Sequence, residues 1–234
     1  MKRKLLIFDA GPIISMGLNG LLPALTGLKE NFGGEFAIPH QVRKELVDTP
    51  FRKHRFQFEA LQIMELIRNK TLKVYNLPSV RKESNELLDL ANNIYAARGQ
   101  SIRIVHGGEI EAIALAMHLN AEALIIDERT TRYLLEKPAA LRKRLERKLH
   151  THIEVDRQKL DDFRKRVGKL PALRSTELIA VGFEDGVLDH YLPGMKNGKR
   201  ILISSLLWAL KLRGCAISDD ELHQLIKLEA GERI

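Results

Sequence analysis

Short apolar runs followed by helix signals recur in the first half of the chain. Residues 5–8 form a continuous apolar run that ends at Asp9, and Pro12 follows where a helix would begin. A second apolar run, residues 36–38, leads through Pro39 into the sequence HQVRKELV. Such runs are typical of strands buried on both faces, and proline suits the first helical turn. We therefore predict two strand-to-helix units.

The segment 107–127 has the clearest pattern in the sequence. From Ile110 onward, apolar residues fall at positions i, i+3, i+4 and i+7, which predicts a helix with one buried face. After a turn, the apolar run 123–126 predicts a strand that ends at Asp127. Because helix and strand run in opposite directions, the start of the helix and the end of the strand lie at the same edge.

The remaining elements are expected as follows: helix 57–70, strand 72–77, basic helix 141–150, edge strand 152–155, helices 156–168, 175–191 and 201–212, and a short helix after an N-cap at Ser218. Strands that alternate with helices predict an α/β fold with a mainly parallel sheet and helices on both faces. Without a long linker, we expect a domain over residues 1–156 and a helical C-terminal extension, 157–234, packed on it.

Four carboxylates stand where a predicted strand ends or the following helix begins: Asp9, Glu45, Glu109 and Asp127. Ligands of open α/β sheets bind at the carboxyl ends of the strands. Clustered carboxylates repel one another unless a cation neutralises them, and oxygen ligands suit Mg²⁺ or Mn²⁺. Such ions can activate a water for phosphodiester hydrolysis, so the pattern predicts metal-dependent cleavage of a nucleic acid.

Ordinary structural roles are open for the same four residues. Asp9 and Asp127 could cap helices or form turns, and Glu109 could complement a helix dipole. Glu45, about two turns beyond Pro39, has the least support from position and could be a surface residue. We expect the neighbours Glu111 and Glu128 not to bind a metal directly.

The basic balance of the chain favours a polyanionic partner. Lys and Arg number 38 against 30 Asp and Glu, a formal net charge of +8. Candidates for binding the phosphates of a nucleic acid are Arg129, Arg132, Arg142, Lys143 and Arg144. The last three could equally form a solvated helix face. Residues 51–56 mix aromatic and basic side chains, as surfaces for single strands do, although Phe56 and Phe58 could belong to the core.

Other sequence features bear on the cellular compartment and on which kinds of catalytic or metal site are expected. A single cysteine, Cys215, excludes an internal disulfide and suits a reducing compartment. The sequence has no apolar run long enough for a signal peptide or a membrane span, so we expect a cytoplasmic protein without a membrane partner. The pair His150 and His152 has no further ligands to complete a zinc site. No serine-hydrolase or phosphate-loop motif is present.

Three segments, in order, carry a family resemblance: IFDAGPII, IPHQVRKEL and GGEIEAIALAMHLNAEALIIDERTTR. They resemble the PIN-domain family of metal-dependent ribonucleases over about residues 4–155. The closing stretch RGCAISDDELHQLI resembles the C-terminal end of one prokaryotic PIN subfamily. This resemblance implies a Rossmann-like three-layer α/β/α fold. It also implies Mg²⁺ or Mn²⁺ held by Asp9, Glu45, Glu109 and Asp127, and an endoribonuclease that cuts single-stranded RNA.

The resemblance also implies partners, and two departures bear on them. PIN domains are often dimeric, and the apolar stretch ILISSLLWAL fits either a homodimer interface or a core helix. Toxins of toxin–antitoxin pairs are prominent members, but the region 141–200 is far longer than the one that a compact PIN toxin has, so a housekeeping nuclease is favoured over a chain with an antitoxin partner. Ala10 stands where a hydroxyl residue is common. A non-catalytic RNA- or ribonucleoprotein-binding module is the competing hypothesis.

Overall fold

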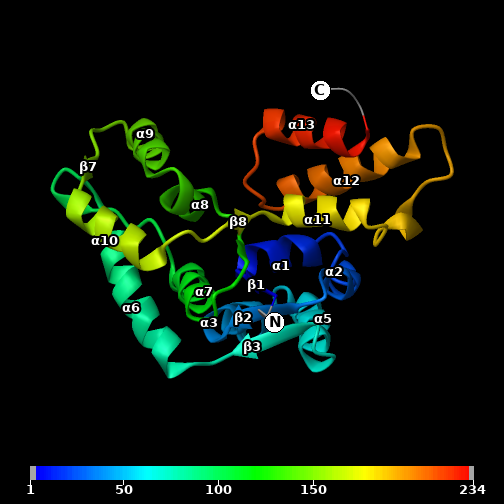
Figure 1. The fold of residues 1–234 in the computed structure, drawn as a ribbon, viewed down its shortest axis with the longest axis horizontal. Helices are drawn as coiled ribbons and strands as arrows, with labels where there is room; N and C mark the ends of the chain where they lie inside the picture. Colours follow the sequence, from blue (N-terminus) through cyan, green and yellow to red (C-terminus); the bar gives the residue numbers. More distant parts are fainter. Residues whose placement is uncertain (1–3, 232–234) are drawn as a thin grey trace.

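A parallel sheet organises the molecule. The computed structural model describes residues 4–231 (Figure 1). Within them, five strands form the central sheet in the order β3-β2-β1-β6-β8, and each neighbouring pair is parallel. The strands are β1 (Leu5–Phe8), β2 (Glu35–Pro39), β3 (Leu72–Tyr75), β6 (Ala123–Ile125) and β8 (Ala172–Leu173). The predicted parallel α/β architecture is confirmed.

The apolar run of β1 explains why the sheet is covered on both faces. Leu6 and Phe8 pack into one core cluster, whereas Leu5 and Ile7 pack into the other. Because successive strand side chains point to opposite faces, a continuous apolar strand requires helices on both sides. The fold therefore has three layers, which agrees with the α/β/α expectation.

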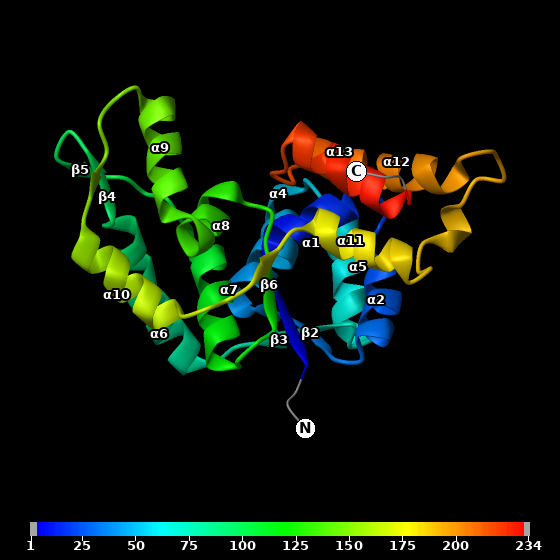
Figure 2. The same cartoon turned by 45° about the horizontal axis from the view of Figure 1, so that its top comes forward.

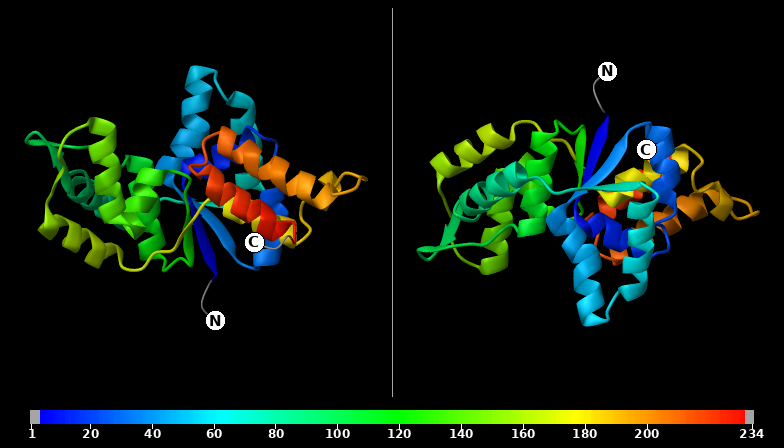
Figure 3. Two further views of the ribbon diagram at one scale, coloured as in Figure 1. Left: turned by 90° about the horizontal axis from the view of Figure 1, so that it is seen from above. Right: turned by 90° about the horizontal axis from the view of Figure 1, so that it is seen from below.

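Each face has its own group of helices (Figure 3). The first cluster includes α1 (Ala10–Gly17), α2 (Ala24–Phe32), α5 (Gln57–Arg68), α11 (Ser175–Glu184), α12 (Gly198–Leu212) and α13 (Asp219–Glu229). The second includes α6 (Pro78–Asn92), α7 (Gly107–His118), α8 (Arg129–Glu136), α9 (Pro138–Leu149) and α10 (Arg157–Val167). At the carboxyl end of the strands, β2 is followed by α3 (His40–Arg43), a π-helical turn (Lys44–Asp48) and α4 (Thr49–Lys53).

Several predicted boundaries were wrong. A second, antiparallel sheet combines β4 (Tyr95–Ala97), β5 (Gln100–Ser101) and β7 (Glu154–Val155) near α9 and α10 (Figure 2). The strand expected over 152–155 is thus shorter, and His150 instead ends α9 in a left-handed conformation. The helix expected over 175–191 ends at Glu184, and only a 3-10 turn (Asp189–Tyr191) follows.

The residues after 156 are integrated into the fold. β8 extends the central sheet, since the Leu124 and Ile126 amides donate to the carbonyls of Pro171 and Leu173. Helices α11, α12 and α13 pack in sequence on the α1 side (Figure 1). The predicted N-cap at Ser218 is confirmed, because its hydroxyl accepts from the Glu221 amide. Cys215 is buried, as expected for a small core residue.

None of the helices within residues 4–231 has both the length and the apolar character needed to cross a bilayer.

Candidate active site

An acidic cavity of about 540 Å³ lies at the carboxyl edge of the central sheet. Its lining includes all four predicted carboxylates, Asp9, Glu45, Glu109 and Asp127. Asp9 directly follows β1, Glu109 lies in the first turn of α7, and Asp127 lies two residues beyond β6. Residues separated by more than a hundred positions thus meet as the parallel topology predicts. We call this the acidic cavity.

Asp9 both caps the helix α1 and lines the acidic cavity. Its Oδ2 accepts a hydrogen bond from the Gly11 amide at 3.2 Å, so the residue caps α1. Only 6% of the residue is exposed. Burial raises the pKa of Asp9 to about 6, and the charges of Glu45 and Asp127 raise it further against its backbone hydrogen bonds. The capping interpretation is therefore correct without excluding a role in the cavity.

Glu109 is the second carboxylate with a strongly shifted pKa. Burial raises its pKa to about 7, and the charges of Asp9 and Glu128 act in the same direction. The Thr131 hydroxyl donates to Oε2, which partly offsets the effect. Carboxyl groups that share a site and lack a cation are expected to hold protons in this way.

Asp127 is held by three donors from outside its own segment. The Ser175 amide donates to Oδ1 at 2.8 Å, and the hydroxyls of Ser175 and Ser15 donate to Oδ2 at 2.8 and 3.0 Å. Ser15 comes from α1 and Ser175 from the first turn of α11. The carboxylate is thus fixed between two helices. Sequence reasoning missed both serines, because no local pattern connects them with Asp127.

Glu45 reaches the cavity because the facing helix has a glycine. It lies in the π-helical turn, and the Gln41 side chain donates to its Oε1 at 3.3 Å. A Cβ on Gly108 would lie 2.7 Å from Oε1 and 3.0 Å from Oε2 of Glu45. Such distances are too short for a real Cβ contact, so only glycine lets this carboxylate approach α7.

The two neighbouring glutamates have local contacts. Glu111 is buried and accepts a hydrogen bond from the Gln41 amide at 3.0 Å, which ties α3 to α7. Glu128 is exposed at the cavity rim and caps α8 by accepting from the Thr130 amide at 3.0 Å. Glu128 therefore lines the cavity, whereas Glu111 is not among its lining residues within 4–231, and the prediction that neither binds a metal directly stays a prediction.

Two nitrogen-bearing side chains of the cavity were missed by sequence reasoning. Arg103 and His106 are exposed and line the same space as the four carboxylates. They precede the Gly107-Gly108 pair, so the segment RIVHGG was the available signal. Burial raises the pKa of Glu45, and the charge of His106 opposes that shift.

The predicted basic residues lie elsewhere. The lining of the acidic cavity, as described within residues 4–231, does not include Arg129, Arg132, Arg142, Lys143 or Arg144. Arg132 pairs with Glu136 at 3.6 Å, and Arg142 pairs with Glu146 at 3.2 Å. The contact of Arg142, whose side chain is 42% exposed, agrees with a solvated helix face, whereas the Arg132 side chain is only 15% exposed.

The aromatic and basic segment is on the surface. Phe56 and Phe58 are 36% and 68% exposed, so their alternative assignment to the core was wrong. The guanidinium of Arg55 lies 4.6 Å from the centre of the Phe56 ring.

The donor atoms of the acidic cavity suit a hard divalent cation. All four acidic groups offer oxygen, which Mg²⁺ and Mn²⁺ prefer. Within residues 4–231, no three His, Cys, Asp or Glu side chains stand close enough to cage an ion by themselves. Mg²⁺ commonly retains several waters and binds only one or two carboxylates, so this spacing fits it. Burial first and neighbouring carboxylates second raise the pKa values of Asp9 and Glu109, and a cation beside them would favour their charged forms.

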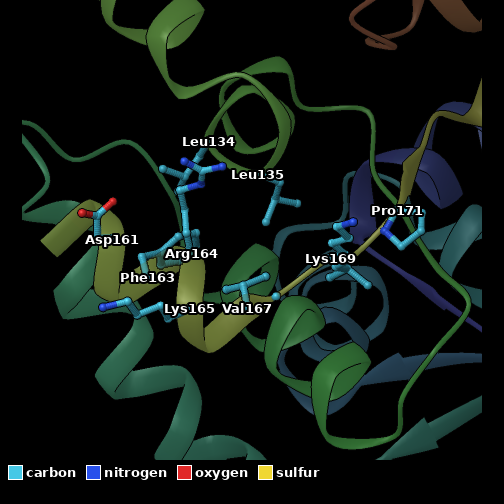
Figure 4. A pocket seen from close by; sticks show the side chains of 11 residues that line it. Leu134, Leu135, Asp161, Phe163, Arg164, Lys165, Val167, Lys169 and Pro171 are labelled. Atoms are coloured by element: carbon cyan, nitrogen blue, oxygen red, sulfur yellow. The ribbon is translucent and has the colours of Figure 1, made fainter. Parts of the chain in front are cut away.

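A larger cavity, of about 780 Å³, lies between α8, α10 and the segment leading to β8 (Figure 4). Apolar side chains such as Leu135 and Phe163 line it together with Arg164, Lys165 and Lys169. Its one lining carboxylate, Asp161, has basic neighbours around it. Size therefore does not identify the reactive site, and the acidic cavity is the better candidate because perturbed carboxyl groups converge there.

Comparison with known proteins agrees with the geometry. A family model described as a PIN domain matches residues 5–138, which include all four carboxylates and stop before Ser175. No curated protein and no solved structure matches the chain.

Proposed function

Because the chain belongs to the PIN-domain family, we propose that it is a divalent-metal-dependent endoribonuclease that hydrolyses phosphodiester bonds in single-stranded RNA. PIN domains are nuclease-like modules, which gives the broad class. The convergence of Asp9, Glu45, Glu109 and Asp127 on one cavity is the observation that carries the proposal. The formal net charge of +8 supports a polyanionic substrate.

In this proposal, Mg²⁺ or Mn²⁺ would be held in the acidic cavity by Asp9, Glu45, Glu109 and Asp127, one or two of them binding directly and the others through water. When bound, it would supply charge neutralisation and a water of lowered pKa for attack on the phosphodiester. Ser15 and Ser175 hold the Asp127 carboxylate in one orientation. Gly108 leaves room for the Glu45 carboxylate beside α7.

The side chains of Arg103 and His106 have their own role in the proposal. Arg103 and His106 provide donors beside the carboxylates, where a phosphate would otherwise meet only negative charge. Donors aimed at a phosphoryl group stabilise the charge that develops on its oxygens during hydrolysis. The cavity thus joins an acidic part that suits a cation with a basic part that suits the phosphate.

The test compares Asp9→Asn and Asp127→Asn with the wild type in cleavage of single-stranded RNA with Mn²⁺. We expect each variant to lose on the order of a hundredfold in rate, because each removes a charge that the cation requires. Asp161→Asn, in the larger cavity, is the matched control and should retain full activity. Unchanged cleavage in both site variants would refute the assignment.

Calorimetric titration separates the enzyme from a non-catalytic RNA-binding module. Metal uptake by the wild type that is lost in Asp9→Asn supports the nuclease. RNA binding with no metal uptake supports the binding module.

A further inference from the structure

A second cavity, of about 320 Å³, adjoins the acidic cavity. The two share Arg103, His106, Glu109 and Glu128. We call the second one the flanking cavity. Because four residues belong to both linings, a chain of nucleotides that enters one cavity has a direct path into the other.

The walls of the flanking cavity differ from those of the acidic cavity. Ile102, Ile104, Leu145 and Leu149 supply an apolar surface. Ile104 and Leu145 are nearly buried, whereas Leu149 is 40% exposed. Lys148 adds a positive charge to this lining and is not among the residues shared with the acidic cavity. An apolar surface with a few polar groups at its rim is typical of a site for an organic ring that carries charged substituents.

Resting on the proposed function, we infer that the flanking cavity binds the nucleotide next to the scissile phosphate. The base lies against the apolar wall, and Arg103 and Lys148 contact the phosphates on its two sides. Arginine suits this position, because its planar guanidinium both stacks on bases and binds phosphate oxygens. The volume is at the lower end of the roughly 300–1,000 Å³ of ligand pockets, which matches one nucleotide better than a peptide helix.

This placement also explains a preference for single strands. A base paired within a duplex presents neither a free face nor a free edge to a lateral cavity, whereas an unpaired base can be splayed out. The flanking cavity would therefore accept RNA by the availability of its bases, and the acidic cavity would act on the adjoining phosphate.

The first test fills the cavity with Leu149→Trp. Leu149 is 40% exposed, so the indole ring of tryptophan can be accommodated there without disrupting the core. Binding of a fluorescein-labelled single-stranded oligoribonucleotide is followed by anisotropy in EDTA, where no cleavage occurs. We expect about tenfold weaker binding, the size of one lost base contact of about 1.4 kcal/mol. A thermal melt checks that the variant is folded.

The second test removes one charge and does not depend on the first variant folding. Lys148→Ala is compared with Arg147→Ala, an exposed neighbour on α9 that does not line the cavity. We expect Lys148→Ala to weaken binding several-fold and to reduce the slope of log affinity against log salt by about 0.7. Arg147→Ala should change both the affinity and the salt slope less than Lys148→Ala does.

The outcomes separate the two proposals. Loss of binding in Leu149→Trp and Lys148→Ala supports the flanking cavity, even if the wild type cleaves no RNA and the nuclease proposal fails. Wild-type affinity in both variants overturns the flanking cavity, even if the nuclease proposal stands. A wild type that binds no oligoribonucleotide overturns the inference outright.

Discussion

Two charged clusters meet at the consecutive residues Arg174 and Ser175, and their charges are balanced in different ways. In the acidic cavity, burial and like charge raise the pKa of Asp9 to about 6 and that of Glu109 to about 7. In the second, which we call the Arg174 cluster, the buried guanidinium bonds Glu177 at 2.6 Å and Glu221 at 3.3 Å. Paired charge stabilises the fold, whereas unpaired charge marks a site for a ligand.

The Arg174 cluster also supports the acidic cavity. Burial raises the pKa of Glu221, but hydrogen bonds from Ser218 and the charge of Arg174 outweigh that effect and lower it to about 2. Arg174 thereby connects α11 with α13, and the next residue, Ser175, donates to Asp127. The region beyond the matched residues 5–138 thus orients a carboxylate that lies within them.

The comparison is tested most strongly by Arg174→Met. The change removes the hydrogen bonds from the buried guanidinium to Glu177 and Glu221, so we expect a loss of about 2 to 3 kcal/mol in the free energy of unfolding. Arg166→Met is the matched control, because Arg166 also bonds two glutamates, Glu83 and Glu86, but at the surface. It should cost about 1 kcal/mol or less. Urea denaturation measures both, and equal losses would contradict the distinction between the two clusters.

The pH dependence of stability should distinguish the clusters next. The folded-state pKa values of Asp9 and Glu109 lie above their unfolded values, so their contribution is present below about pH 4 and is lost as pH rises to about 7. That of Glu221 is present above about pH 4.5 and is lost as pH falls toward 2. In EDTA, we expect the acidic cavity to lower stability by about 2 kcal/mol between pH 5 and pH 6, and further toward pH 8.

The double variant Asp9→Asn/Glu109→Gln is the control for this effect. It should lose that part of the pH dependence, and Mn²⁺ should raise the melting temperature of the wild type more at pH 8 than at pH 5. If wild type and double variant show the same pH profile in EDTA, the two carboxyl groups do not carry the shift.

Local patterns predicted the framework but not the contacts between distant segments. The apolar run before Asp9 and the helical spacing after Gly107 were enough to place three carboxylates at one edge of a parallel sheet. The position of Glu45 had less support, because it depends on a π-helical turn and on Gly108 across the cavity.

Contacts that depend on tertiary structure left no periodic signal. Ser175 lies 48 positions from Asp127, and the strand β8 that places it has only two residues. The helix α6 was not predicted, although four of its residues are buried at helical spacing. The local spacing of α6 was therefore an available signal that was missed, whereas the contact of Ser175 with Asp127 depends on the packing of distant segments and could not be derived from any one window of the sequence.

Ser175→Ala tests, with a smaller expected effect, the contact by which the segment of the Arg174 cluster orients Asp127 in the acidic cavity. The change removes the hydroxyl donor to Asp127 but leaves the amide donor, so we expect a loss of about 1 kcal/mol in stability. As a positioning residue, Ser175 should also affect metal affinity, measured by Mn²⁺ titration, severalfold. Ser205→Ala, on the exposed side of α12, should change neither quantity. An unaltered Mn²⁺ affinity would limit Ser175 to a structural role.

Gly108→Ala should give the smallest effect on stability and so isolates the geometry of the acidic cavity. Its added methyl would meet the Glu45 carboxylate at 2.7 Å and displace it from α7. A helical Gly→Ala change otherwise favours folding by up to about 1 kcal/mol, so we expect little net change in unfolding and a fall of about tenfold in cleavage. Gly107→Ala is the matched control, because a Cβ at that position meets nothing within 4 Å. Equal activities of the two variants would show that the approach of Glu45 to α7 is not needed for the reaction, and the acidic cavity would then depend on Asp9, Glu109 and Asp127 alone.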